Sequence, residues 1–119
     1  MKISRDEADR LFSHLIKLRD DGKCQYCGKA GNQCSHFHSR RKFSTRFDLD
    51  NAMWTCASCH FYLGEHPNIH SEFFEKRLGS VKYEELNIRA MQIVKRTKQN
   101  MEEIRSKLRE QIKTLGGKR

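Results

Sequence analysis

The first hydrophobic pattern along the chain predicts an amphipathic helix over residues 4–20. Ser4 followed by Glu7 three positions later has the spacing of a capping box, which places the helix start at Ser4. The residues Asp20-Asp21-Gly22 are typical of a helix end. Apolar residues recur between these signals at the spacing of one helix face: Ala8, Leu11, Phe12, Leu15 and Leu18.

The middle of the chain, residues 28–55, has no helical period and favours extended structure. Its last segment, 52–55, reads Ala-Met-Trp-Thr and predicts a short strand or hairpin. A short helix is expected over 56–63 and another over 67–78. The second has a proline in its first turn and a glycine after its last residue.

The C-terminal part predicts one long helix over residues 82–115, because it contains no internal glycine or proline. Its apolar residues include a heptad series: Val94, Met101, Leu108 and Leu115. This seam either packs on the rest of the chain or forms a homodimer. Residues 89–119 hold ten Lys/Arg against three Glu, so contact with phosphates is a further alternative. The chain thus divides into a core, 1–80, and a basic C-terminal helix, 81–119.

The composition is that of a small, basic domain. Of 119 residues 36% are hydrophobic, and 24 Lys+Arg against 15 Asp+Glu give a formal charge of +9. No stretch approaches the roughly 18–20 apolar residues of a membrane span, and the first ten residues lack the apolar run of a secretory signal. We therefore expect a cytoplasmic protein with no membrane segment, whose partner is a polyanion, with nucleic acid the first candidate.

Four of the five cysteines form two Cys-x-x-Cys pairs: Cys24, Cys27, Cys56 and Cys59. Disulfides are disfavoured in a reducing cytosol, whereas two such pairs about 29 residues apart are typical of a structural Zn²⁺ site with four thiolates. Two alternatives stay open. The cysteines are reduced core residues, or Cys34, His36 or His38 replaces one thiolate.

Three polar residues lie between and after these pairs at separations of 15 and 9: His36, Asn51 and His60. Together with the cysteines, this arrangement resembles the HNH, or ββα-metal, nuclease family across residues 24–64. The resemblance implies an α+β fold with a treble-clef-like zinc ββα core, flanked by the N-terminal and C-terminal helices. It also implies that His36 is the general base, Asn51 its positioning residue, and His60 the ligand of a catalytic Mg²⁺ or Mn²⁺.

The implied chemistry fits the residue types. Hydrolysis of a phosphodiester needs a deprotonated water, and neutral imidazole accepts that proton near pH 7. A divalent cation offsets the charge that develops on the phosphate. One position departs from the family, because Ser35 stands where many members have Asp or His as a second metal ligand. His38 is the alternative ligand, since residues i and i+2 of a strand share a face, and an exchange of roles between His36 and His38 stays open.

A run of basic residues lies between His36 and Asn51: Arg40, Arg41, Lys42 and Arg46. Beside a hydrolytic site these residues suit phosphate contacts, whereas without one they would form an ordinary solvated face. His66 and His70, four residues apart at the start of a predicted helix, are expected to form a surface pair.

A longer resemblance, over about residues 16–79, is to the phage NinG (Rap) recombination nucleases. It is carried by IKLRDDGKCQYCGK and by CSHFHSRRKFSTRFDLDNAMWTCASCHFYLGEHPNIHSEFFEKRLG. It implies a phage or prophage DNA endonuclease that acts near the nucleoid of the bacterial host on branched or recombination-intermediate DNA. The alternative from another class is a non-catalytic zinc-dependent DNA-binding module acting in recombination, which Ser35 favours.

Overall fold

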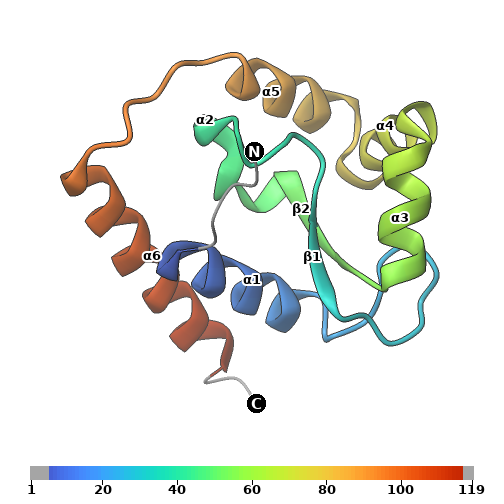
Figure 1. The fold of residues 1–119 in the computed structure, drawn as a ribbon, viewed down its shortest axis with the longest axis horizontal. Helices are drawn as coiled ribbons and strands as arrows, with labels where there is room; N and C mark the ends of the chain where they lie inside the picture. Colours follow the sequence, from blue (N-terminus) through green and yellow to red (C-terminus); the bar gives the residue numbers. More distant parts are fainter. Residues whose placement is uncertain (1–5, 117–119) are drawn as a thin grey trace.

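The computed structural model describes residues 6–116, which form an α+β fold (Figure 1). Six α-helices, one 3-10 helix and a two-stranded sheet occur in this part of the chain. The elements are, in order, α1 (Glu7–Arg19), β1 (Gln33–His36), α2 (Phe43–Arg46), η1 (Leu49–Asn51), β2 (Ala52–Thr55), α3 (Ala57–Glu65), α4 (Pro67–Leu78), α5 (Ser80–Ala90) and α6 (Lys98–Gly116). No described helix combines the length and the apolar character needed to cross a membrane.

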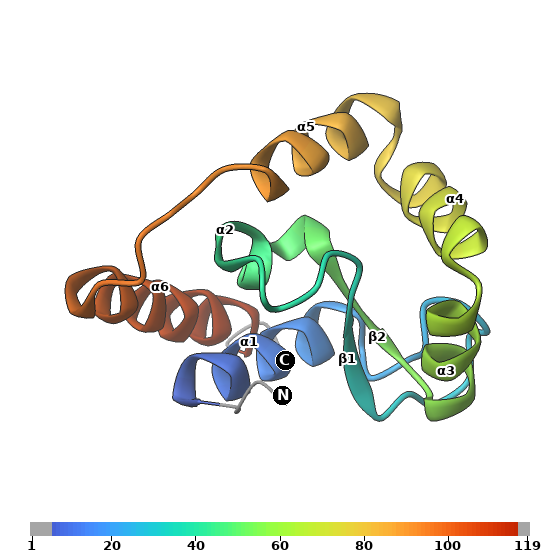
Figure 2. The same ribbon diagram turned by 45° about the horizontal axis from the view of Figure 1, so that its top comes forward.

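The two strands pair antiparallel, with Ser35 opposite Met53 and His36 opposite Ala52. Because side chains alternate along a strand, these two pairs lie on opposite faces of the sheet. One face packs on α1, which α6 covers in turn, and the other packs on α3 and α4 (Figures 1 and 2). The sheet is therefore the middle layer between two groups of helices.

The two apolar clusters differ in size. On the α1 and α6 side, the buried residues are Ala8, Phe12, Leu15, Ile16, Ala52, Trp54, Met101 and Leu108. On the α3 and α4 side, they are Met53, Leu63 and Phe74. The cluster on the α3 and α4 side therefore has fewer fully buried side chains than the cluster on the α1 and α6 side.

The predicted N-terminal helix is confirmed, but α1 begins at Glu7. Its cap is Asp6, whose side chain accepts from the backbone N–H of Asp9, while the Asp9 carboxylate accepts from the backbone N–H of Asp6. This reciprocal pair takes the place of the predicted box of Ser4 and Glu7. Ser4 lies outside the described residues.

The two short helices predicted after the second cysteine pair are also confirmed. Helix α3 starts directly after Cys56 and continues through Gly64 to Glu65, slightly beyond its predicted end. Helix α4 has Pro67 at its start and is followed by Gly79, whose φ of 87° lies in the left-handed region. Glycine adopts that conformation without the steric cost of a Cβ atom, so the sequence signal for this helix end is reliable.

The prediction of one continuous helix over 82–115 is wrong. Helix α5 ends at Ala90, residues 91–97 are not helical, and α6 runs back alongside α1 (Figures 1 and 2). The break is set by burial, because folding back places Met101 and Leu108 in the same cluster as Phe12. Thr97 provides the local start signal, since its hydroxyl accepts from the backbone N–H of Asn100.

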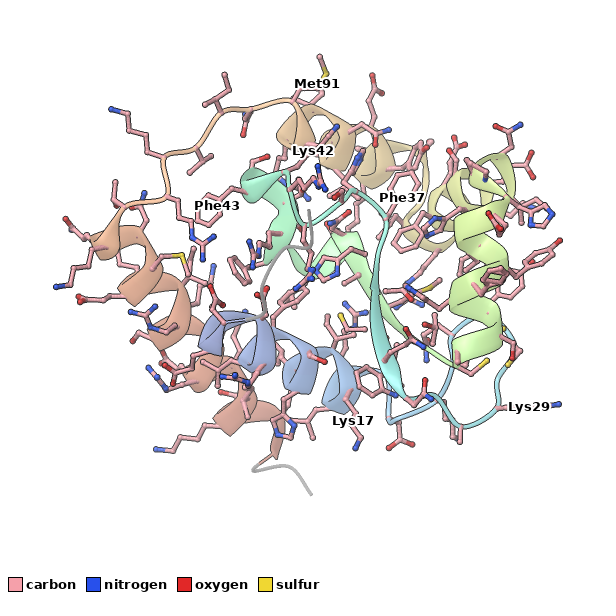
Figure 3. The ribbon with its side chains drawn as sticks, viewed as in Figure 1. Lys17, Lys29, Phe37, Lys42, Phe43 and Met91 are labelled. Carbon is pink, nitrogen blue, oxygen red and sulfur yellow. The ribbon has the colours of Figure 1, made fainter. Side chains whose placement is uncertain are left out.

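Three members of the heptad series, Met101, Leu108 and Leu115, therefore pack in the α1 cluster of the same chain. The fourth, Val94, lies in the non-helical segment before α6 and is exposed. An ion pair between Arg109 and Glu7, at 2.5 Å, joins α6 to α1, and a second, at 2.6 Å, joins Arg96, just before α6, to Asp6, the cap of α1. Several exposed apolar side chains lie at the break; Met91, for example, is 81% exposed (Figure 3).

Candidate functional site

The four cysteines of the two Cys-x-x-Cys pairs converge on one point. The Sγ atoms of Cys24, Cys27, Cys56 and Cys59 all lie within 4.8 Å of one another. The Sγ atoms of Cys27 and Cys56 are 3.8 Å apart, and the edge of a tetrahedron with Zn–S bonds of about 2.3 Å is also about 3.8 Å. The donor set and its spacing therefore fit a structural metal ion such as Zn²⁺.

Local structure shifts the pKa values of these thiols in opposite directions. The backbone N–H of Cys59 and hydrogen bonds from neighbouring thiols lower the pKa of Cys56 to about 6, whereas burial and the nearby sulfurs raise the pKa of Cys59. Gly28 closes the first pair with a φ of 82°, and its N–H donates to the carbonyl of Cys24 at 2.8 Å. A bound cation would stabilise all four thiolates. Cys34 does not belong to this cluster.

The candidate general base, His36, is held in one orientation by a backbone carbonyl. Its Nε2 lies 2.9 Å from the carbonyl oxygen of Arg46, and its ring centroid lies 5.5 Å from that of Phe12. Because a carbonyl oxygen only accepts, neutral His36 carries its proton on Nε2, which leaves Nδ1 unprotonated. Burial lowers the pKa of His36, so the neutral form prevails at neutral pH.

Asn51, the expected positioning residue of His36, does not provide the carbonyl that contacts the His36 ring. Its carbonyl oxygen accepts from the N–H of Phe37 at 2.8 Å, and its fully buried side chain joins two ends of a loop. The side-chain oxygen accepts from the N–H of His38 at 2.7 Å, and the amide donates to the carbonyls of His38 and Thr45, both at 3.0 Å. Asn51 thus fixes residues 38–45, the loop that carries most of the basic run.

The candidate metal ligand, His60, lies on α3 opposite β1. Its Nδ1 is 2.6 Å from the hydroxyl of Ser35, which in turn is 2.5 Å from the hydroxyl of Thr55. If His60 donates from Nδ1 and Ser35 donates onward to Thr55, the Nε2 lone pair of His60 is available to a cation. Ser35 then orients the ligand, which is the usual role of a hydrogen-bond partner beside a metal-binding histidine.

His36 and His60 line the same cavity, although they approach it from opposite faces of the sheet. The cavity has a volume of about 530 Å³, and its lining also includes Asp9 from α1 and Arg40 from the loop after β1. Among the described residues β1 pairs with β2 alone, so its other edge is unpaired.

The other histidines lie elsewhere. The Nε2 atom of His38 is 2.7 Å from the side-chain oxygen of Asn87 on α5, and His38 does not line the cavity. The expected surface pair of His66 and His70 is wrong, because only His66 is exposed. The half-buried His70 packs against the rings of both Phe37 (labelled in Figure 3) and Phe74, at 5.1 and 5.2 Å, and the structure gives its Nε2 no hydrogen-bond partner among the described residues.

The basic run does not form one surface. Arg41 and Lys42 are exposed, and Arg40 is half-buried at the cavity. Arg46, expected to contact DNA, is only 3% exposed and pairs with Asp9, so that prediction is wrong. Burial of a guanidinium is tolerated only with such a partner.

Asp9 and the Ser35 contact are the parts of this site that sequence reasoning missed. Asp9 precedes Phe12 by three residues and Ile16 by seven, so it lies on the apolar stripe of its helix. A carboxylate on such a stripe was the available signal that it meets a buried cation.

No protein-family model matches the sequence, and no match is found among curated proteins or solved structures. What the structure itself defines is a small α+β protein with a four-cysteine cluster able to hold a metal. A separate cavity, lined by two histidines and an arginine, lies beside it.

Proposed function

We propose that this protein is a metal-dependent endonuclease that hydrolyses phosphodiester bonds in DNA by HNH-type chemistry. The observation that carries the proposal is the shared cavity of His36, His60 and Arg40. A base, a metal ligand and a cation within reach of one phosphate are the groups that this reaction requires. The resemblance adds the substrate class, which is branched or recombination-intermediate DNA of a phage or prophage.

In this mechanism the Nδ1 atom of His36 accepts the proton of the attacking water. The hydrogen bond from Nε2 to the carbonyl of Arg46 keeps the ring in the tautomer that can do so. His60 would hold Mg²⁺ or Mn²⁺ through Nε2, and the cation would supply charge stabilisation to the phosphate and the leaving oxygen. Arg40 binds a non-bridging phosphate oxygen, and the exposed Arg41 and Lys42 contact flanking phosphates.

The cysteine cluster has a structural role in this proposal. Zn²⁺ bound by four thiolates leaves no open coordination position for a substrate. It joins the loop after α1 to the start of α3, and so holds the helix that carries His60 against β1, in a treble-clef-like arrangement.

The test is cleavage of labelled duplex, single strand, flap and four-way junction, with and without added Mg²⁺ or Mn²⁺. Omission of the cation is preferable to EDTA, which would also compete for the structural zinc. We expect cation-dependent cutting that His36→Ala abolishes and that His14→Ala, a change at an exposed histidine of α1, leaves intact. Binding without cutting on every substrate would support the non-catalytic zinc-dependent DNA-binding module instead.

A further inference from the structure

The buried carboxylate of Asp9 lies at the wall of the candidate active site, although it comes from the N-terminal helix. Asp9 is 6% exposed and lines the same cavity as His36. Its two oxygens accept from Nε and Nη2 of Arg46 at 3.0 and 2.5 Å. The Nη1 atom of Arg40 lies 3.6 Å from the same carboxylate. One side chain thus contacts both arginines of the site.

Arg46 transmits this contact to the base. Its guanidinium is held by Asp9, while its backbone carbonyl accepts the Nε2 proton of His36 at 2.9 Å. Although burial alone would raise the pKa of Asp9, hydrogen bonds from Arg46 and from the N–H of Asp6 lower it overall, so the carboxylate is ionised. Because both oxygens of the ionised Asp9 accept from Arg46, the pair fixes the orientation of the guanidinium as well as its distance from Asp9.

The carbonyl of Arg46 belongs to α2, a helix too short to be stable without contacts to the rest of the chain. Helix α2 is four residues long, and its preceding residue, Lys42, makes no side-chain capping bond. A single helical turn is unstable alone, because its nucleation is unfavourable. Asn51 anchors α2 through the carbonyl of Thr45, and the pair of Asp9 with Arg46 anchors its last residue.

We propose that Asp9 is a positioning residue of the active site, which fixes the tautomer and orientation of the His36 imidazole through Arg46. This inference rests on the proposed nuclease function. It assigns α1 a role in the reaction in addition to its role in the core. Asp9 itself does not touch the reacting atoms.

The test compares Asp9→Asn with Glu7→Gln, which removes a carboxylate from the same helix but from an exposed pair with Arg109. For Asp9→Asn we expect kcat to fall about 10- to 100-fold, since misplacement of a reacting group by about 1 Å can cost that much. The affinity for uncut DNA should stay within about 3-fold, because the exposed phosphate contacts are retained. Glu7→Gln should leave both quantities unchanged.

An activity-independent readout is the tautomer of His36, measured from the ¹⁵N shifts of its two ring nitrogens. We expect the Nε2-protonated form alone in the native protein and in Glu7→Gln, and a mixture of tautomers in Asp9→Asn. A folded Asp9→Asn protein with native kcat, or with a native tautomer despite a lower kcat, would overturn the inference. If the native protein cuts no DNA, the function proposal fails, while the tautomer result still decides the role of Asp9.

Asp9→Asn leaves the Arg46 charge buried without its partner, which can prevent folding. The double variant Asp9→Asn with Arg46→Gln removes both charges and keeps two polar side chains that can hydrogen bond. We expect the double variant to regain the native melting temperature that the single variant loses. It should not regain the native kcat or the single tautomer of His36. Recovery of all three would overturn the positioning role, because stability alone would then account for the effect of Asp9.

Discussion

Loss of the four-cysteine site is expected to release α3 and α4 from the sheet while the α1 and α6 layer persists. The perturbation is Cys59→Ser, which removes one thiolate from the cluster. Among the described residues beneath these helices, Met53, Leu63 and Phe74 form the fully buried cluster, and five partly buried apolar side chains pack against it. At about 1.5–3 kcal/mol for each fully buried apolar side chain, these three contribute roughly 4.5–9 kcal/mol.

A bound Zn²⁺ would contribute more than these three side chains. Structural Zn²⁺ sites in small peptides contribute apparent free energies of about 10–16 kcal/mol, which exceeds the roughly 4.5–9 kcal/mol of the three fully buried side chains. The cluster on the opposite face of the sheet has eight buried residues, and none of them is one of the four cysteines. We therefore expect local unfolding on one face rather than loss of the whole fold.

The assay is amide hydrogen exchange combined with measurement of bound zinc. Cys59→Ser should lose zinc and show fast exchange in α3 and α4, with protection retained in α1 and α6. Cys34→Ser is the matched control, because Cys34 lies outside the cluster. A Cys59→Ser protein that binds zinc with native affinity and keeps native protection in α3 would refute this reasoning.

Three further predictions concern the base, the helical layer and the DNA contacts. Burial lowers the pKa of His36 below its ordinary 6.5, so the proposed base should give a kcat/KM–pH profile that is level above pH 6.5 and falls only at lower pH; an acid limb above pH 7 would exclude this base. Leu108→Ala should cost about 2–5 kcal/mol in urea unfolding, because Leu108 is buried between α1 and α6, whereas the half-buried Leu115→Ala should cost less. Replacing Arg41 and Lys42 with alanine should reduce the slope of log Kd against log salt by about 1.8, at about 0.9 per phosphate contact; an unchanged slope would mean that they are ordinary surface residues.

The features that were predictable from the sequence are set by neighbouring residues. Helix α4 was placed correctly because Pro67 and Gly79 mark its two ends. The cysteine cluster followed from spacing, since each Cys-x-x-Cys pair turns on itself and delivers two sulfurs. In both cases the determining contacts lie within a few residues along the chain.

The features that were missed depend on contacts between distant segments. Residues 91–97 contain no glycine or proline, and their one local signal is the Thr97 cap of α6; the break itself follows from the packing of Leu108 in the cluster with α1. Similarly, the run of basic residues does not show which arginine turns inward. Arg46 does so because Asp9, 37 positions earlier, provides a buried partner.

The edge position of β1 explains why the site needs both layers of helices. Ser35 and His36 are adjacent on this strand and therefore point to opposite faces. Ser35 orients His60 from the α3 side, while His36 lies on the α1 side with Phe12 and the carbonyl of Arg46. The two imidazoles share one cavity only while α3 and α1 both remain packed on the sheet. Under the proposed nuclease function, loss of the cysteine cluster and loss of the Asp9 contact should therefore both impair cleavage, the first by displacing His60 and the second by displacing His36.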